Sequence, residues 1–202
     1  MARRTLQLHG RPRLHRRHLA TDRTLHMRNR NARVIGLGAL IGVLSLCAAP
    51  AHATCSGSGL GTLNCSATVS ATAMSFGSYS AGTSSATTTS STITVTATFS
   101  GRILGTDTLS YTLSLSAGNS GTTASRYMSY GSRTLSYNLY TSSGYGTVWA
   151  TDTVSGSASV SVGFNGNASA STTHTVYGRI PAGQYTAAPG SYSDTITVTV
   201  TY

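Results

Sequence analysis

Residues 193–202, with the sequence SDTITVTVTY, place apolar and polar side chains at strictly alternating positions. A period of two puts successive side chains on opposite faces of an extended chain, so this stretch is predicted to be a β-strand with one buried face. The apolar face consists of Ile196, Val198, Val200 and Tyr202. A long strand with such a face needs a neighbouring strand, either within the fold or from another chain. This requirement favours assembly over catalysis as the function of the chain.

The positive charge of the chain is concentrated before residue 34. Ten of the 14 Lys+Arg residues are arginines at or before Arg33, so nearly all of the formal net charge of +10 lies in this part of the chain. After residue 53, four arginines stand against three aspartates. Binding to the phosphates of a nucleic acid requires clustered cations, so the composition argues against a nucleic-acid partner for the folded part.

An apolar run at Val34–Cys47 follows these arginines and leads to the small-residue sequence Ala51-His52-Ala53. A basic region, a short apolar core and an A-x-A site are the three parts of a secretory signal peptide. We therefore expect residues 1–53 to be the signal region, with cleavage after Ala53 and secretion of the remainder.

The start of this signal has an alternative. If translation begins at Met27, the signal peptide is 27–53, which is an ordinary length, and residues 1–26 are not translated. In either case the apolar run is shorter than the about 20 apolar residues of a membrane-spanning helix. Stable membrane insertion is therefore not expected.

Two cysteines, Cys55 and Cys65, remain after the expected cleavage. An even pair in an exported protein is predicted to form a disulfide, which here would close a short glycine-rich loop. The alternative is a metal or redox pair. His174 is the one histidine after residue 53, which leaves too few ligands for a zinc site. We therefore expect no metal and no cofactor.

Residues 54–202 have the size of one domain. Short alternating runs separated by Gly, Ser and Asn clusters predict seven or eight antiparallel strands, packed as an all-β sandwich. Arg179 and Asp194 are expected to pair across strands, and Ser80–Ser91, which lacks the alternation, is expected to be a loop. The expected strands are Ala67–Ala73, Ile93–Phe99, Leu109–Leu115, Leu135–Tyr140, Val160–Phe164, Thr175–Ile180 and Thr195–Tyr202.

Residues with catalytic or sugar-binding potential are few. His174 with Asp107 or Asp152 and a serine would resemble a hydrolase triad, but no G-x-S-x-G sequence marks an activated serine. We therefore expect no enzyme activity. Trp149 would suit a sugar-binding platform, although a lone tryptophan on a strand is more often a core residue.

Five sequence motifs resemble those of the spore coat protein U domain family, which includes subunits of archaic chaperone–usher pili. They occur in the family's order and cover nearly all of residues 54–202. The motifs are Val69–Tyr79 (VSATAMSFGSY), Leu115–Gly121 (LSAGNSG), Tyr137–Tyr140 (YNLY) with Val148-Trp149, Val176–Gln184 (VYGRIPAGQ) and Gly190–Tyr202.

The resemblance implies an immunoglobulin-like β-sandwich that lacks its last strand and is completed by strand donation. A periplasmic chaperone would fill the groove first, and at an outer-membrane usher the N-terminal extension of a neighbouring pilin subunit would replace it. The implied function is a structural subunit of a surface fibre, a pilus or fimbria, with a role in adhesion or biofilm formation. The groove is expected to be lined by Ile196, Val198, Val200, Tyr202, Ala67, Val69 and Ala71.

Departures from the family pattern bear on this function. Relatives usually carry a cysteine where Ala97 stands, and Cys55 is expected to supply the replacement partner for Cys65. A donor subunit needs an alternating apolar arm ahead of its first strand, whereas Thr54–Asn64 offers only two leucines. The chain would then accept a strand without giving one, or it would be a spore- or cell-coat protein built from the same domain. A carbohydrate-binding module is a third alternative.

Overall fold

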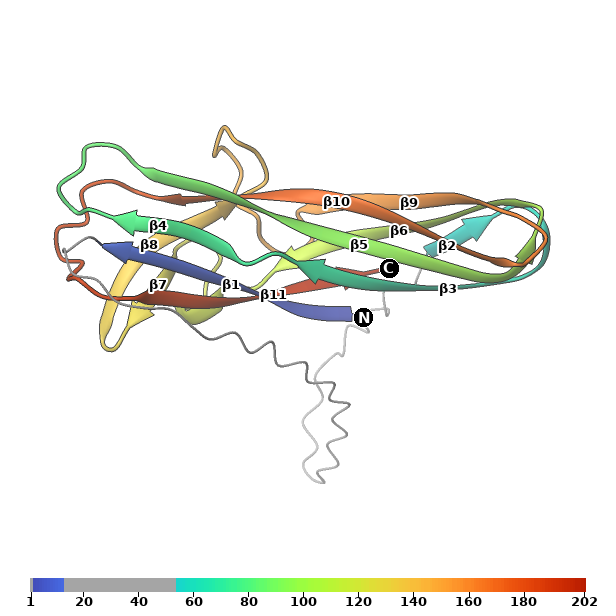
Figure 1. The fold of residues 1–202 in the computed structure, drawn as a ribbon, viewed down its shortest axis with the longest axis horizontal. Helices are drawn as coiled ribbons and strands as arrows, with labels where there is room; N and C mark the ends of the chain where they lie inside the picture. The colour runs from blue at the N-terminus through green and yellow to red at the C-terminus, as the bar shows by residue number, and fades with distance from the viewer. Residues whose placement is uncertain (1, 13–53) are drawn as a thin grey trace, which may run out of the picture.

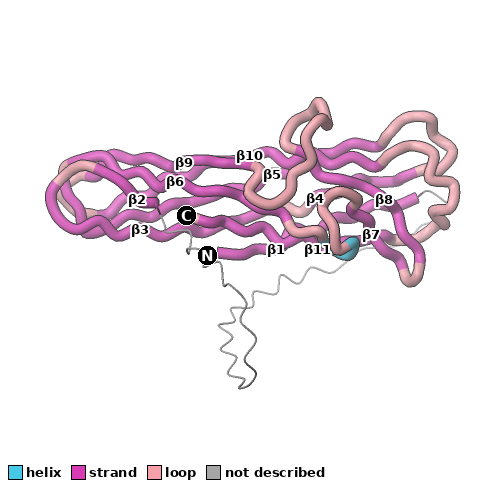
Figure 2. The backbone as a smooth tube through the Cα atoms, turned by 180° about the vertical axis from the view of Figure 1, so that it is seen from behind, coloured by secondary structure: helices cyan, strands magenta, loops and turns pink. Residues whose placement is uncertain are grey.

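The computed structural model describes residues 2–12 and 54–202, so the expected apolar core of the signal, Val34–Cys47, lies outside the described part. Within it the chain forms an elongated all-β structure, in which η1 (Gly118–Ser120) is a single helical turn (Figures 1 and 2). The first strands are β1 (Ala2–Pro12), β2 (Thr54–Gly57), β3 (Leu60–Ala71), β4 (Met74–Tyr79), β5 (Thr87–Ile103) and β6 (Gly105–Leu115). The remaining strands are β7 (Arg126–Tyr130), β8 (Arg133–Tyr140), β9 (Val154–Val162), β10 (Asn167–Ile180) and β11 (Tyr192–Thr201).

The strands form two layers, as the sequence predicted. In one layer β6 pairs with β2, β9 and β11, and β11 pairs in turn with β7 and β1. In the other, β5 lies between β3 and β10. The hairpin partner of β7, β8, also pairs with β10 and so joins the two layers on one side. These pairs are all antiparallel, which confirms the predicted all-β antiparallel sandwich.

The core lies between the layers and follows the period of two. Ile93, Val95, Ala97 and Phe99 on β5 are fully buried, and the threonines between them face outward or lie half-buried. On β11 the same alternation buries Ile196, Val198 and Val200 completely. A β-branched polar residue such as threonine suits the outer face of a strand, so one face of these strands can be exposed to solvent without charged residues.

Several boundaries differ from those expected. The expected loop Ser80–Ser91 is shorter, because β5 begins at Thr87 and pairs with β10 from there onward. The expected strand Ala67–Ala73 is the end of β3, which begins at Leu60 and ends at Ala71, and no strand was expected at β4, which begins at Met74. Two further short strands, β2 and β7, were also missed. Their four and five residues are too few to show a period.

Candidate functional site

The candidate site is a slot one strand wide between β11 and β4, in which β1 lies (Figure 1). β1 runs antiparallel to β11, from Ala2 opposite Val200 to Gly10 opposite Tyr192. It runs parallel to β4, from Leu8 opposite Met74 to the end of the strand. Among the described strands, β1 is the one that pairs with β4. We call this space the strand slot.

The residues expected to line a groove lie on two elements around this slot. Ile196, Val198 and Val200 are on β11, and Tyr202 follows it and is half-buried. The other three are on β3, where they pair with β5 rather than with the strand in the slot. All seven belong to the apolar core or pack against it: Ile196, Val198, Val200, Tyr202, Ala67, Val69 and Ala71.

The second wall of the slot was not expected from the sequence. It is β4, whose Met74, Phe76 and Tyr79 are buried. Tyr79 fastens this strand to the loop after β10, because its hydroxyl donates a hydrogen bond to Pro181 O (3.2 Å) and accepts one from Gln184 N (3.0 Å). Met74 and Phe76 lie in the motif Val69–Tyr79, but the expected first strand ended at Ala73, so no strand was predicted for them.

One end of the slot is built around the carboxylate of Asp194, which is buried. Its Oδ2 accepts a hydrogen bond from the Tyr137 hydroxyl (2.7 Å), and its Oδ1 accepts from the backbone N–H of Asn119 (2.8 Å) and of Thr195 (2.7 Å). Gly118 has a φ of 65°, and a Cβ there would overlap the carboxylate. The motif around Gly118 is therefore glycine-containing because it packs directly on Asp194.

A buried cation balances this carboxylate. All five N–H groups of Arg126 are engaged, with the carbonyls of Leu115, Ser116, Thr123 and Trp149 and the side-chain oxygen of Asn138 as acceptors. Burial lowers the pKa of Arg126, and the negative charge of Asp194 opposes that shift. Burial together with the hydrogen bond to Asp194 raises the pKa of Tyr137, which stays a neutral donor. The network ties β6, β7, β8 and β11 together and fixes the position of β11 along the slot.

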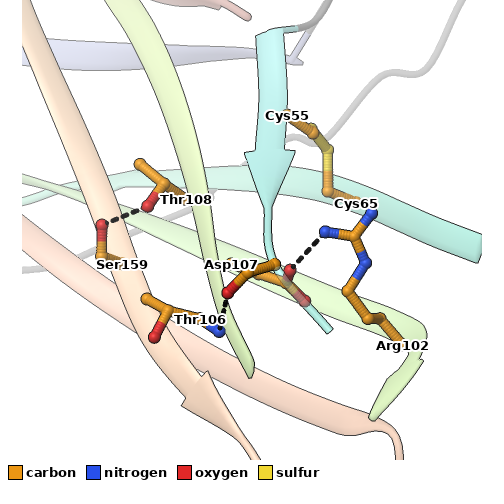
Figure 3. A network of polar contacts seen from close by, with 8 residues as sticks. Cys55, Cys65, Arg102, Thr106, Asp107, Thr108 and Ser159 are labelled. Carbon is orange, nitrogen blue, oxygen red and sulfur yellow. Dashed lines mark hydrogen bonds and ion pairs between the residues drawn. A yellow bond between two sulfur atoms is a disulfide. The ribbon is translucent and has the colours of Figure 1, made fainter. Parts of the chain in front are cut away.

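A second feature lies at the start of residues 54–202. β2 pairs with β6 from Thr54 opposite Ser110 to Gly57 opposite Asp107. A disulfide joins Cys55 on β2 to Cys65 on β3, with 6.5 Å between their Cα atoms (Figure 3). The predicted disulfide is thereby confirmed.

The same region contains a buried ion pair. The carboxylate of Asp107 is 1% exposed and lies 3.4 Å from Nη1 of Arg102 (Figure 3). A Cβ at Gly57 would overlap that carboxylate, so β2 can lie against β6 at this point only because the residue is glycine. The glycine thus allows the short strand to close over the charged pair.

Residues considered for catalysis are not joined in the structure. The Nε2 atom of His174 hydrogen-bonds the Tyr111 hydroxyl (2.7 Å), whereas Asp107 faces Arg102. Asp152 accepts hydrogen bonds from Thr112 and Ser114. Within residues 54–202, no cluster of three or more His, Cys, Asp or Glu side chains could hold a metal ion.

Trp149 is buried, and its indole N–H donates to Leu113 O (3.3 Å), so its ring offers no free face to a sugar. The expected pair of Arg179 and Asp194 is wrong: Arg179 lies over the ring of Tyr145, 5.5 Å from its centroid. In the described part of the chain, no helix has the length and hydropathy needed to cross a membrane.

Comparison with known proteins identifies one family. The model of the Spore Coat Protein U domain matches residues 49–199, which is well over half of the chain. A search of curated proteins finds no match. The matched range contains β2 through nearly all of β11, and therefore both walls of the strand slot and the disulfide.

Proposed function

Since the chain belongs to the Spore Coat Protein U domain family, we propose that it is a secreted structural subunit of a surface fibre. Its sandwich is completed by a β-strand from another chain, which enters the strand slot between β11 and β4. The proposed route to the surface begins with removal of a signal peptide after Ala53.

The observation that carries the proposal is the origin of the strand now in the slot. β1 comes from residues 2–12, within the expected signal region 1–53, and would be lost from the secreted chain whether export cleaves after Ala53 or translation begins at Met27. Without β1, β4 has no strand partner among the described residues, and β11 loses the neighbour that spans Tyr192–Val200. The secreted domain therefore has a vacant strand position with an unpaired backbone edge on each side.

An open slot is costly. The core-facing side chains of β11 are fully buried with a strand in place, and burial of one such side chain contributes about 1.5–3 kcal/mol. Several of these contributions weaken when the slot empties, whereas the net stability of a domain is only about 5–15 kcal/mol. An exposed, apolar and unpaired edge also favours aggregation. The secreted domain should therefore need an added strand to persist.

Strand addition explains the partners we propose. In this proposal a periplasmic chaperone fills the slot during transit. At an outer-membrane usher, a strand from a neighbouring subunit then replaces the chaperone. Backbone hydrogen bonds to two edges give such a complex its affinity, and the alternating side chains give it specificity. Adhesion or biofilm formation at the cell surface would be the role of the resulting fibre.

The geometry of the slot suggests a direct test. Because Ala2 lies opposite Val200, residues 2–12 can follow Tyr202 through a short Asn-Gly turn and enter the slot as the second strand of a hairpin. We call this variant of residues 54–202 the filled chain, and unmodified residues 54–202 the open chain. Leu6→Asp in the filled chain is the matched control, since Leu6 pairs with Ile196.

We expect the filled chain to be monomeric, with a urea midpoint well above those of the open chain and of the Leu6→Asp control. N-terminal sequencing of exported protein should give Thr54 as its first residue. An open chain that is monomeric and as stable as the filled chain would refute the proposal, because its sandwich would then be complete without a donated strand.

A further inference from the structure

We propose that the secreted chain is a one-ended subunit, which accepts a strand from a second chain but cannot donate one and so occupies the end of a fibre. This inference rests on the proposed function, because it concerns the direction in which strands are exchanged. It comes from what the first residues of the secreted part do in the structure.

The segment that would have to act as the donor is already used in its own fold. β2 pairs with β6, and from Leu60 onward β3 pairs with β5. Only Ser58 and Gly59 lie between the two strands, and the Ser58 N–H donates to Thr106 O (3.0 Å). The backbone of the first residues is thereby hydrogen-bonded within the chain, with no stretch free to reach another molecule.

The disulfide adds a geometric exclusion. Cys55 and Cys65 are ten residues apart and their Cα atoms are 6.5 Å apart. The same ten steps in an extended strand would cover about 33 Å, at about 3.3 Å per residue. A segment that carries this bond cannot be an extended strand over its length. A donor long enough to fill the slot, in which β1 pairs with β11 from Ala2 to Gly10, cannot be drawn from these residues while the bond is intact.

The side chains of the segment do not suit the slot either. The strand in the slot carries its two leucines, Leu6 and Leu8, two residues apart, and therefore on one face of the strand. The apolar residues of the segment, Leu60 and Leu63, are three apart and would face opposite sides of a strand. The glycines of the segment also weaken an extended conformation.

Packing at the turn holds the segment in place. Gly59 and Gly61 have φ values of 121° and 105°, and a Cβ at Gly61 would overlap Gly101 O. A Cβ at Gly105 would likewise overlap Ser58 O. The turn between β2 and β3 therefore lies in direct backbone contact with the turn between β5 and β6. A donor arm formed from these residues would have to break this contact.

The test separates giving a strand from accepting one. The filled chain has an occupied slot, so it cannot accept, but its N-terminal segment is unchanged. It is mixed with the open chain, whose slot is vacant, and complexes are measured by size-exclusion chromatography with light scattering. A second filled chain, with residues 2–12 and a short linker grafted ahead of Thr54, serves as a donor of known sequence.

We expect no complex between the filled and open chains, and a one-to-one complex when the grafted donor is present. A one-to-one complex without the graft would overturn the inference, because residues 54–64 would then be able to act as a donor, while the proposed function would stand. If neither mixture forms a complex, the slot does not take a strand from outside, and the proposed function itself fails.

Discussion

The substitution Val198→Asp tests the role of the strand slot most directly. Val198 lies at the middle of β11, is fully buried, and pairs with Arg4 of the strand in the slot. Replacing it removes a buried side chain worth about 1.5–3 kcal/mol. It also brings a carboxylate into the core, and an uncompensated buried charge costs about 3–5 kcal/mol. The two effects together are comparable with the whole stability of an ordinary domain.

In the filled chain the residue opposite position 198 is Arg4, so the test is made in a filled chain that also carries Arg4→Ala, which leaves no cation opposite the new charge. All five N–H groups of Arg126, the buried cation of the core, are already engaged. We therefore expect Val198→Asp to abolish cooperative unfolding of this filled chain in urea, followed by circular dichroism. In the periplasm, the same substitution should prevent recovery of a soluble one-to-one complex with the chaperone.

Thr197→Asp is the matched control, because it adds the same charge one residue away on the outer face. Thr197 is half-buried, and its links to Ser116 are made by its backbone N–H (2.8 Å) and carbonyl (3.0 Å), which the substitution leaves intact. We expect a loss of no more than about 0.5–1 kcal/mol, partly from repulsion by Asp152 across the same polar hollow. If both variants lose the same stability, the two faces of β11 are equivalent and the reasoning behind the slot is refuted.

Three further predictions concern residues away from the slot. Cys65→Ser should lower the free energy of unfolding by about 2.5–3 kcal/mol in chemical denaturation, and thiol labelling of denatured native protein should find no free cysteine. Burial lowers the pKa of His174 from its ordinary value of 6.5, so the unfolded chain binds the proton more tightly than the folded chain. The free energy of unfolding should therefore be highest above pH 6.5 and should fall as the pH drops below it. His174→Gln should flatten this dependence in urea titrations at about pH 7.5 and pH 5, and an unchanged slope would contradict the assignment. Leu104 has a φ of 54° and a half-exposed side chain, so Leu104→Gly should raise the thermal midpoint by the equivalent of about 0.5 kcal/mol, while Leu104→Ala should not.

The period of two was enough to predict the layers of this protein. β11 and the middle of β5 each show strict alternation over many residues, and both strands face the core as expected. The beginning of β5 was read as a loop because Thr87–Ser91 contains no apolar residue. Its strand conformation comes from pairing with β10, opposite residues 176–180, which is a long-range contact that the local sequence does not reveal.

Neighbour relations between strands were the harder part. Arg179 and Asp194 lie on consecutive strands, and a hairpin between them would have allowed the expected ion pair. In the structure β10 pairs with β5 and β8, whereas β11 pairs with β6, β7 and β1, so the two residues have different surroundings. The second wall of the slot, β4, was missed for the same reason: at the break at residues 72–73 the chain changes its sheet partner, and the buried positions shift from Ala67 and Val69 to Met74 and Phe76.

The proposed strand addition would give the buried charges around Asp194 and Arg126 a structural role, which is to hold the register of β11. A strand that must wait for a neighbour cannot rely on that neighbour to set its register, and a shift of one residue would turn its apolar face to water. Asp194 holds β11 through the Tyr137 hydroxyl and the Asn119 N–H, both of which belong to elements other than the slot. Arg126 adds the ends of β6 and β8 to the same unit. None of these contacts involves β1, so under the proposed strand addition they would set the register of β11 before a donated strand arrives.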